Sequence, residues 1–541
     1  MNAATASASR SRIQAWFAAR TPWQRRGAAV AAGALATLGH APFQFTLAFG
    51  AAMVVLVWLL DVSATKERRL RSAFSIGWFF GLGHFVTGLY WVAAAFNVDS
   101  DAWGPMWGVP AALALSAGLA LFFGLGAVIA TLLWTNDVRR IAAFTIGFFV
   151  SEWLRGNILT GLPWLLPAYV WAPGEPISQL ASLIGAYGLT LVTLLVAAAP
   201  AALADGGQSA GRRFAPVLVA ALAVGMAWGW GAQRIATAVV DPPGALPVIR
   251  VADSGLGQAD KWQNRPDQEW RVLQRYLEVS GEPSDDNADT IVIWPEGAIP
   301  VVNFFMLENP DFMAALGRDL GDRVLITGLT RREMQADGLA YFNSAAVIDG
   351  VNGEARISQI YNKNHLVPFG EYIPFWSLIS NLNIAPLQRI GAGFEAGPPP
   401  TRLIVPGAPP AVVLICYEAI FPGMIPHGDG RPGWIVMVTN DAWFGGGSGP
   451  YQHYAMARYR AIEEGLPVAR AASGGISAIV DAYGREVRST NGRVLFAEAQ
   501  LPPALPETPW VRWGSILLVA LLVLILGLRF LPSGRKELGG L

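Results

Sequence analysis

Eight long apolar stretches constrain what this chain can fold into more than any other feature of its sequence. Their lengths, from 13 to 28 residues, lie around the roughly 20 residues that an α-helix needs to span a lipid bilayer. Because 53% of the 541 residues are hydrophobic and only 14% are charged, the composition also excludes an ordinary water-soluble protein. We therefore predict a membrane protein, whose candidate spans are residues 27–39, 43–60, 73–96, 107–134, 141–156, 176–203, 214–232 and 512–531.

The spans divide the chain into three parts. Seven of them lie within residues 1–245, a polar domain occupies residues 246–505, and residues 506–541 contain the eighth span and a short tail. The sequence therefore predicts an α-helical membrane bundle of eight spans joined to one large domain outside the membrane. Residues 1–40 also resemble a secretory signal, but the next apolar run follows Pro42 at once and favours an uncleaved first span.

Positive charge beside the spans indicates how the chain is oriented, since cytoplasmic loops carry the excess of Lys and Arg. With eight spans, all basic clusters fall on one side, whereas the loop at residues 97–106 carries Asp99 and Asp101 and no basic residue. We predict that both termini are cytoplasmic and that the polar domain, which follows an odd-numbered span, faces the outside or the periplasm. The basic clusters are Arg10, Arg12, Arg20, Arg25 and Arg26; Lys66, Arg68, Arg69 and Arg71; Arg139 and Arg140; Arg212 and Arg213; and Arg529, Arg535 and Lys536.

Within the polar domain, short β-branched runs alternate with helical stretches and turn residues. The runs are almost wholly apolar, which is typical of a sheet covered on both faces, so we predict an α/β layered domain. The helical candidates are residues 266–279, 309–316 and 451–464, and Arg460 is placed to pair with Glu464 in the last of them. The candidate strands are residues 248–252, 290–294, 324–329, 344–348, 357–361, 411–415, 434–439, 468–472 and 476–481.

Three chemically reactive residues follow three of these strands. They are Glu296, Lys363 and Cys416, and the last is the only cysteine in the chain. Because open sheets bind ligands at the ends of their strands, a carboxylate, an ammonium and a thiol could meet in one crevice. There the carboxylate can take the proton of the thiol, and the ammonium can favour the thiolate and stabilise an oxyanion. Taken singly, each residue also fits a structural role, as a turn carboxylate, a solvated lysine and a core cysteine.

Longer motifs surround each of these residues. Glu296 ends a Trp-Pro-Glu motif, Lys363 lies in Tyr-Asn-Lys-Asn-His-Leu-Val-Pro-Phe-Gly-Glu, Cys416 begins Cys-Tyr-Glu, and residues 439–445 read Thr-Asn-Asp-Ala-Trp-Phe-Gly. Together they resemble the carbon-nitrogen hydrolase (nitrilase) superfamily. The resemblance is closer to its membrane branch, the apolipoprotein N-acyltransferases of Gram-negative bacteria, which carry such a domain between the last two of eight membrane helices. It extends through residues 40–43, 81–92, 152–164 and 449–464 and so covers nearly the whole chain.

The resemblance implies a fold and a reaction. The fold is an α-β-β-α sandwich of nitrilase type for the polar domain. In the reaction, a cysteine thiolate takes a fatty acyl chain from a phospholipid, typically phosphatidylethanolamine, and forms a thioester. The α-amine of the N-terminal diacylglyceryl-cysteine of an apolipoprotein then accepts the chain. By match to the motifs, Cys416 would be the nucleophile, Glu296 the general base and Lys363 the residue that stabilises the oxyanion.

Further residues match supporting positions of the family. Glu371 would assist proton transfer or hold Lys363, Tyr417 and Glu418 would shape the surroundings of the thiol, and Trp262 would help at the site. Two segments depart from the family pattern: residues 252–256 read Ala-Asp-Ser-Gly-Leu, and residues 472–475 read Ala-Ser-Gly-Gly in place of an expected asparagine pair. Neither departure touches the three catalytic candidates, so both bear on substrate contacts.

The implied partners are a phospholipid donor, a diacylglyceryl-apolipoprotein acceptor and the bilayer of the bacterial inner membrane, in which we expect a multi-pass monomer. Apolar segments at residues 301–305 and 372–394, with Phe375 and Trp376, are predicted to form arms that dip into the outer leaflet, although core packing explains them equally well.

The sequence also argues against other ligands. The chain has equal numbers of acidic and basic residues, 39 each, which does not favour nucleic-acid binding. The spacing of the histidines favours no metal site, so we expect no cofactor. The alternatives are a membrane-tethered amidase that passes its acyl group to water and a transporter with an accessory domain.

Overall fold

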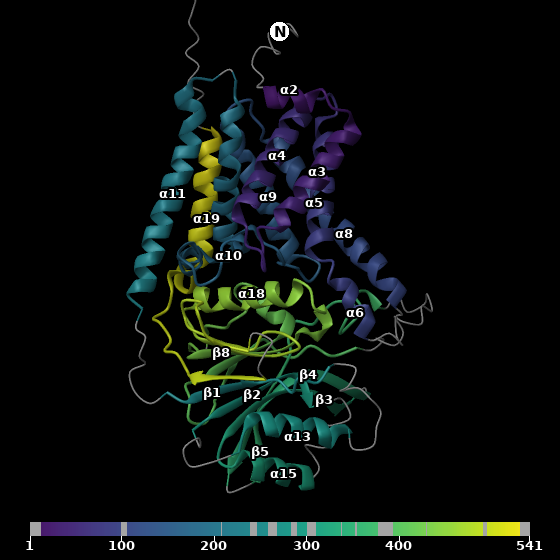
Figure 1. Cartoon of the computed structure of the whole chain (residues 1–541), viewed down its shortest axis with the longest axis vertical. Coiled ribbons are helices and arrows are strands. Elements are labelled where there is room, and N and C mark those ends of the chain that lie inside the picture. Colours follow the sequence, from purple (N-terminus) through teal and green to yellow (C-terminus); the bar gives the residue numbers. More distant parts are fainter. Residues whose placement is uncertain are drawn as a thin grey trace, which may run out of the picture.

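The computed structural model describes residues 12–98, 105–206, 208–238, 246–257, 268–282, 289–299, 310–336, 338–351, 354–376, 393–428, 430–490 and 495–530. It has two parts, a bundle of helices at one end of the molecule and a domain of strands and helices at the other (Figure 1). The last helix, α19, returns to the bundle, so the chain leaves the bundle once to build the α/β domain and then comes back.

A helix lies at each of the eight stretches predicted to span the membrane. Five helical segments are long and apolar enough to cross a bilayer: Thr46–Ala64, Gly108–Leu132, Pro176–Ala204, Ala210–Ala236 and Pro509–Phe530. The remaining stretches are helices α3, α5 and α9, so the count of eight spans stays a prediction. The bundle helices are α2 (Arg12–Ala18), α3 (Pro22–Thr37), α4 (Thr46–Ala64), α5 (Arg69–Gly88), α6 (Val92–Val98), α8 (Gly108–Leu132), α9 (Arg140–Asn157), α10 (Ala181–Ala198), α11 (Ala210–Ala236) and α19 (Pro509–Phe530).

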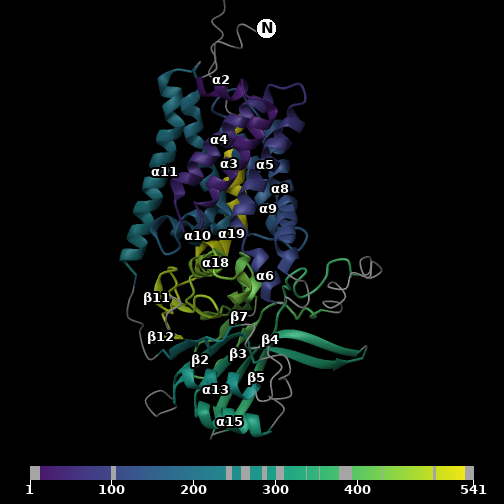
Figure 2. The same ribbon diagram turned by 45° about the vertical axis from the view of Figure 1, so that its right-hand side comes forward.

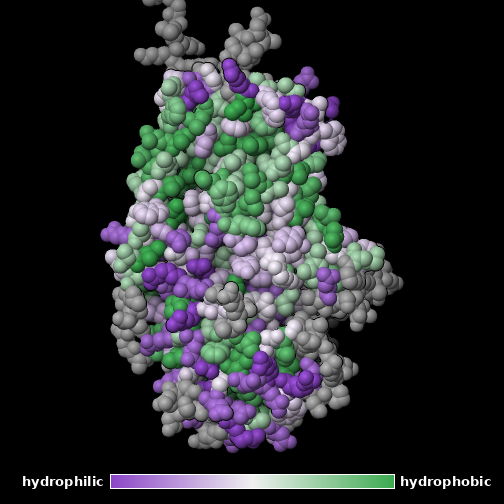
Figure 3. All heavy atoms as spheres, in the orientation of Figure 1, coloured by the Kyte–Doolittle hydropathy of each residue, from purple (hydrophilic) through white to green (hydrophobic). Residues whose placement is uncertain are grey.

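The bundle presents an apolar surface, whereas the surface of the α/β domain is largely polar (Figure 3). Helix α11 contributes much of the apolar surface, because Gly231 is its only buried residue. In α19 only Gly514 and Ile525 are buried. Helices whose exposed faces are this apolar are stable in lipid rather than in water. The chain is therefore a membrane protein, as its composition predicts.

The α/β domain contains two six-stranded sheets, ordered β12-β1-β2-β3-β4-β5 and β11-β10-β9-β8-β7-β6. In the first sheet β1, β2 and β3 run parallel, and in the second β7, β8 and β9 do, while the outer strands are antiparallel. The strands are β1 (Val248–Ala252), β2 (Ile291–Ile299), β3 (Val324–Gln335), β4 (Gly338–Val351), β5 (Glu354–Asn362), β6 (Arg402–Leu403), β7 (Ala411–Ile415), β8 (Trp434–Asn440), β9 (Val468–Ser473), β10 (Ala478–Val480), β11 (Glu486–Ser489) and β12 (Phe496–Gln500). The helices of the domain are α13 (Gln268–Ser280), α15 (Pro310–Leu320) and α18 (Gly449–Glu464).

Alternation of side chains along the strands decides how the sheets are covered. Ile293 of β2 and Val413 of β7 lie in one apolar cluster that both sheets share. Val292 faces the other way, into a cluster with α13 and α15, and Leu414 faces away from the first sheet, into a cluster with α18. Because both faces of these strands are buried, nearly all their residues are apolar. Helix α18 lies between the second sheet and the bundle (Figure 1), so this sheet is the one nearer the membrane.

Most strand predictions are confirmed. Strands β1 and β7 begin and end at the predicted residues, and β4 pairs antiparallel with β5. Strands β3 and β4 extend beyond the predicted ranges and form a long ribbon that projects from the domain (Figure 2). The edge strands β6, β11 and β12 are too short or too polar to stand out in the sequence.

The ion pair predicted within α18 is wrong. Arg460 pairs with Glu463, at 2.7 Å, and Glu464 instead lies 3.4 Å from His427. Residues three and four positions ahead are both neighbours on a helix surface, so spacing alone cannot decide between them. A contact with the bundle explains why Arg460 pairs with Glu463. The carboxylate of Glu463 also accepts the backbone N–H of Ala186 in α10 at 2.6 Å, which holds it on the bundle side of α18.

Candidate active site

The structure brings the three reactive residues together from two sheets. Glu296 lies within β2 rather than after it, because the strand continues to Ile299. Its pairing with β3 is irregular in this last part, where Gly297 has a φ of 61°, a left-handed value that glycine adopts without strain. Lys363 directly follows β5, and Cys416 directly follows β7. The charges of Glu296 and Lys363 both act on the thiol of Cys416.

Lys363 is buried, and carboxylates hold its ammonium group. Its Nζ lies 2.9 Å from each carboxylate oxygen of Glu371 and 4.0 Å from Oε1 of Glu296. Burial lowers the pKa of Lys363, but Glu371, Glu296 and Cys416 together raise it above its usual value. Lys363 is therefore a cation at neutral pH, which a residue that stabilises an oxyanion must be.

Asn343 of β4 joins the two carboxylates of the site. Its Nδ2 donates to Oε1 of Glu296 at 2.7 Å and to Oε1 of Glu371 at 2.6 Å. The other oxygen of Glu296 accepts the backbone N–H of Asn440 at 2.9 Å. Burial raises the pKa of Glu296 and outweighs the opposing charge of Lys363, so this carboxylate is more basic than an ordinary glutamate. Such a shift suits a general base that removes a proton from a thiol.

Cys416 begins the short 3-10 helix η8 (Cys416–Ile420) and is half-buried. Its φ is 50°, a left-handed value that costs a residue with a Cβ on the order of 1–3 kcal/mol. Burial and the charge of Glu296 raise the pKa of the thiol. Lys363 favours the thiolate, as expected, but its charge is outweighed. The sulfur therefore keeps its proton at rest, and a base must remove it when substrate is bound.

Glu418 ties the end of β5 to the end of β7. Its Oε1 accepts the hydroxyl of Tyr361 at 2.7 Å and the backbone N–H groups of Asn364 and His365 at 2.8 and 3.1 Å. Its Oε2 accepts the backbone N–H of Ile415 at 2.8 Å. One buried carboxylate thus fixes the segments on which the lysine and the cysteine lie.

Tyr417 joins the catalytic candidates to the bundle. Its hydroxyl donates to the backbone oxygen of Gly161 at 2.5 Å, and Nε2 of His365 donates to the backbone oxygen of Thr160 at 2.8 Å. Both acceptors lie in the loop that follows α9. The residue beside Cys416 is therefore in direct contact with the membrane part.

A second network of buried charges lies beside the cysteine. Asp441 is 2.7 Å from Nη2 of Arg470 and 3.0 Å from Nδ1 of His453, and Nε2 of His453 is 3.1 Å from the backbone oxygen of Cys416. Burial raises the pKa of Asp441, but Arg470 and His453 outweigh it and lower the pKa to about 2. Asp441 is therefore an anion that compensates the buried arginine.

Both parts of the chain, the helical bundle and the α/β domain, match known protein families. The family of the apolipoprotein N-acyltransferase N-terminal domain matches residues 32–199, and the carbon-nitrogen hydrolase family matches residues 250–501. The apolipoprotein N-acyltransferase of Rhodopseudomonas palustris is 39% identical to this chain, over 97% of this chain and 98% of its own length. The chain belongs to the apolipoprotein N-acyltransferase family. The relative from Bradyrhizobium diazoefficiens is 41% identical over 93% of this chain and 94% of its own length. Among solved structures, an amidase from Nesterenkonia sp. AN1 has a TM-score of 0.33 and 17% identity, over 51% of this chain and 96% of that chain.

The structure describes only some of the residues predicted to support the site. Trp262 and the arm segments at residues 301–305 and 377–392 lie outside the described residues. Phe375 is described and is 68% exposed, and Trp376 beside it is half-buried. The arm therefore stays a prediction, and only a part of it, with these two rings, lies within the described residues.

The two departures from the family pattern contact each other. Oδ2 of Asp253 accepts the backbone N–H of Gly474 at 3.1 Å. The next residue, Gly475, lies against Asp441, and a Cβ at this position would come within 2.2 Å of the Asp441 carboxylate. The two departures therefore form one local arrangement, and its glycine leaves room for the buried network.

Sequence reasoning gave no role to Asn343 or His453. Asn343 directly precedes the predicted strand at residues 344–348, a position that gives little indication of a role; it is the burial of its amide, which then needs hydrogen-bond partners, that indicates one. His453 had none, since a histidine within a helix is as often a packed residue as a functional one. The roles of Asn343 and His453 become visible only from their contacts in the folded structure.

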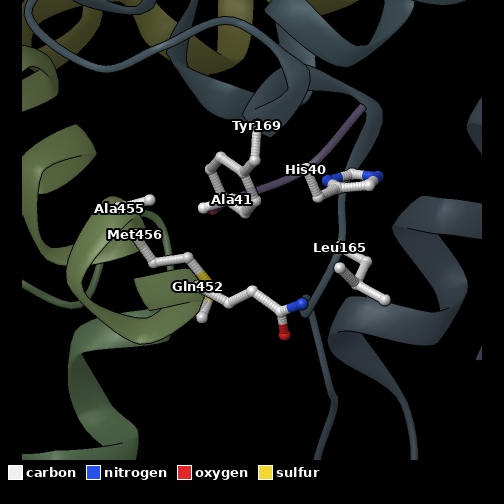
Figure 4. Close-up of a pocket in the computed structure, with 7 residues that line it drawn as sticks. All are labelled: His40, Ala41, Leu165, Tyr169, Gln452, Ala455 and Met456. Atoms are coloured by element: carbon white, nitrogen blue, oxygen red, sulfur yellow. The ribbon is translucent and has the colours of Figure 1, made fainter. Parts of the chain in front are cut away.

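A small cavity lies where the bundle meets α18 (Figure 4), and none of its lining residues is a catalytic candidate. Both ring nitrogens of His40 are buried there without a hydrogen-bond partner among the described residues. Within the described ranges, no group of three or more His, Cys, Asp or Glu side chains could hold a metal ion. The cavity is lined by His40, Ala41, Leu165, Tyr169, Gln452, Ala455 and Met456.

Proposed function

We propose that this protein transfers a fatty acyl chain from a phospholipid of the phosphatidylethanolamine type to the α-amine of the diacylglyceryl-cysteine at the start of apolipoproteins. One observation carries the proposal. In a member of this family, a half-buried thiol lies close enough to the half-buried carboxylate of Glu296 and the buried ammonium of Lys363 for both charges to act on it. Acylation of this amine completes the maturation of the lipoprotein, and no cofactor takes part.

The first half-reaction forms a thioester on Cys416. Glu296 takes the proton of the thiol, the thiolate attacks the ester carbonyl of the donor, and Lys363 stabilises the oxyanion of the tetrahedral intermediate. When the intermediate collapses, the carbon–oxygen bond to the glycerol breaks and Glu296 returns its proton to the leaving alkoxide. The raised pKa of Glu296 supports both steps, because the group must accept a proton and then release it.

The second half-reaction repeats this chemistry with an amine. The α-amine of the acceptor attacks the thioester carbonyl, Glu296 takes a proton from the nitrogen, and the carbon–sulfur bond breaks. Cys416 leaves as a thiolate, recovers the proton from Glu296, and the acyl chain remains on the acceptor as an amide. The two substrates therefore use the same triad in turn, in a ping-pong sequence. Glu371 holds Lys363 during both half-reactions.

The location follows from the substrates, since both have acyl chains in the bilayer. We place the bundle in the bacterial inner membrane with eight spans, both termini in the cytoplasm and the catalytic domain in the periplasm, as an α-β-β-α sandwich and a monomer. The apolar surface of the bundle supports the membrane location (Figure 3). The basic clusters beside the spans support the orientation. The exposed ring of Phe375, with Trp376, supports arms that reach into the outer leaflet.

Mass spectrometry of the purified full-length protein tests the proposal. Incubation with phosphatidylethanolamine should add one fatty-acyl mass to the peptide that contains Cys416, and a diacylglyceryl lipopeptide with a free α-amine should then remove it. A Cys416→Ser variant should fold and show no such thioester. If water discharged the thioester as fast as the lipopeptide does, the result would favour a hydrolase, such as the membrane-tethered amidase, over a transferase.

A further inference from the structure

His453, in α18, holds the backbone of the cysteine. Its ring is buried, and Nε2 lies 3.1 Å from the backbone oxygen of Cys416. A carbonyl oxygen can only accept a hydrogen bond, so Nε2 must carry a proton and donate it. The peptide group that receives this bond belongs to the residue whose φ is 50°. The histidine therefore supports the one strained backbone position that bears the thiol.

The other ring nitrogen is also engaged. Nδ1 of His453 lies 3.0 Å from Oδ1 of Asp441 and 3.2 Å from Nη2 of Arg470. The same oxygen of Asp441 accepts the hydroxyl of Thr439 at 3.1 Å. With both nitrogens bound to other groups, His453 has none left to take the proton of the thiol. A histidine beside a reactive cysteine suggests a catalytic pair in which the histidine is the general base. This geometry does not fit such a pair.

Aromatic rings fix the plane of the imidazole. Trp164 stacks on it with the ring centroids 5.7 Å apart and an interplanar angle of 25°, and Phe444 meets it edge-on at 5.5 Å and 90°. Trp164 comes from the segment after α9, in the membrane part, and its Nε1 donates to Gln452 at 2.8 Å. A residue of the membrane part therefore packs against the histidine ring, in addition to the catalytic domain's own network.

We propose that His453 is a positioning residue of the acyl transfer, which holds Cys416 in its strained conformation through one donated hydrogen bond and is itself held by Asp441 and by Trp164 of the membrane part. This inference rests on the proposed role of Cys416 as nucleophile. Without the donor, the peptide group of Cys416 is free to relax toward an ordinary φ, and the sulfur then moves relative to Glu296 and the donor ester. A misplacement of about 1 Å at a reacting group costs about 100-fold in rate.

Two substitutions separate positioning from mere packing. His453→Leu removes the donor, whereas His453→Gln keeps an amide nitrogen that can reach the same carbonyl oxygen. The full-length variants are mixed with phosphatidylethanolamine in detergent micelles, and the rate constant of thioester formation on Cys416 and the half-saturating donor concentration are measured by mass spectrometry. His427→Gln is the matched control, because this histidine is exposed and is paired with Glu464 rather than with Cys416 or Asp441.

We expect His453→Leu to lower the rate constant about 100-fold with little change in half-saturation, and His453→Gln to recover most of the loss. A leucine variant as fast as wild type would overturn the inference, as would a glutamine variant as slow as the leucine variant while its melting temperature matches that of wild type. Absence of any thioester in the folded wild type would instead overturn the proposed function, and this inference with it.

Discussion

The ammonium of Lys363 contacts both carboxylate oxygens of Glu371 at 2.9 Å. It lies 4.0 Å from the nearer oxygen of Glu296. Under the proposed mechanism, this difference gives the two carboxylates different tasks: Glu371 compensates the charge of the buried lysine, and Glu296 remains available to accept a proton. Asn343, which donates to both carboxylates, fixes the spacing between them.

Replacement of Glu371 tests this division. In Glu371→Gln the ammonium of Lys363 would turn to Glu296, lower the pKa of that carboxylate and weaken it as a base. We expect thioester formation on Cys416 to slow about 100-fold, within the range that general-base catalysis contributes. Single-turnover mass spectrometry measures the rate. Glu395→Gln, at an exposed carboxylate, is the control, and a Glu371→Gln rate equal to that of the control would show that Glu371 does not protect the base.

The rate of thioester formation should depend on pH through Glu296. Burial raises the pKa of this group above the usual glutamate value of 4.5. A raised pKa keeps the group protonated to a higher pH, so its activity as a base is lost earlier as the pH falls. We expect the rate of the wild type to decline on the acid side at a pH clearly above 4.5, with the slope of one proton. A rate that stays level down to the pH at which free glutamate titrates would count against Glu296 as the base.

Cys416 should be slow to react with iodoacetamide at neutral pH, because burial and the charge of Glu296 raise the pKa of its thiol. Alkylation should accelerate steadily as the pH is raised above 8. Glu296→Gln removes one of the charges that disfavour the thiolate, so we expect it to increase alkylation at neutral pH while it decreases thioester formation. Both changes are followed by mass spectrometry of the same peptide. If the two rates moved together, Glu296 would affect only access to the sulfur.

Glu418 should matter for stability more than for the chemical step. Its carboxylate accepts bonds from the ends of β5 and β7, and an amide in its place would leave buried donors without a partner. We expect Glu418→Gln to lower the free energy of unfolding by about 3 kcal/mol, measured by thermal or denaturant unfolding in detergent. Glu354→Gln, at an exposed pair with Arg356, should change it very little. Equal effects of the two substitutions would contradict the structural role of Glu418.

Much of the fold could be predicted from periodicity alone, because the apolar runs that form β7 and the membrane helices have few alternatives. Cys416 stands out because it directly follows such a run, and Lys363 because it lies just after the predicted strand at residues 357–361 and within a longer motif. Asn343 and His453 could not be found, since their roles depend on groups far away in the sequence. The raised pKa of the Cys416 thiol was missed because the sequence shows the neighbouring charges and not the depth of burial, which here decides the outcome.

The arm at Phe375 and Trp376 should affect long acyl chains selectively. Phe375 is 68% exposed in the described structure, and burial of one aromatic side chain in lipid contributes about 1.5–3 kcal/mol. We expect the double substitution Phe375→Ser with Trp376→Ser to slow thioester formation from long-chain phospholipids about 10-fold or more. Soluble short-chain donors should be affected much less. Equal losses, or none, on both donors would show that these rings do not contact lipid during the reaction.

The orientation of the chain can be tested with its own chemistry, because Cys416 is the only cysteine. In a Cys416→Ser background, single cysteines are introduced as Lys66→Cys, between α4 and α5, and as Glu354→Cys, at the start of β5; both positions are exposed. Lys66 belongs to a basic cluster that predicts a cytoplasmic loop, whereas Glu354 lies in the catalytic domain. A maleimide that cannot cross the inner membrane should therefore label the second cysteine in spheroplasts and reach the first only after lysis. The reverse pattern would put the catalytic domain in the cytoplasm, where it could not meet acceptors in the outer leaflet.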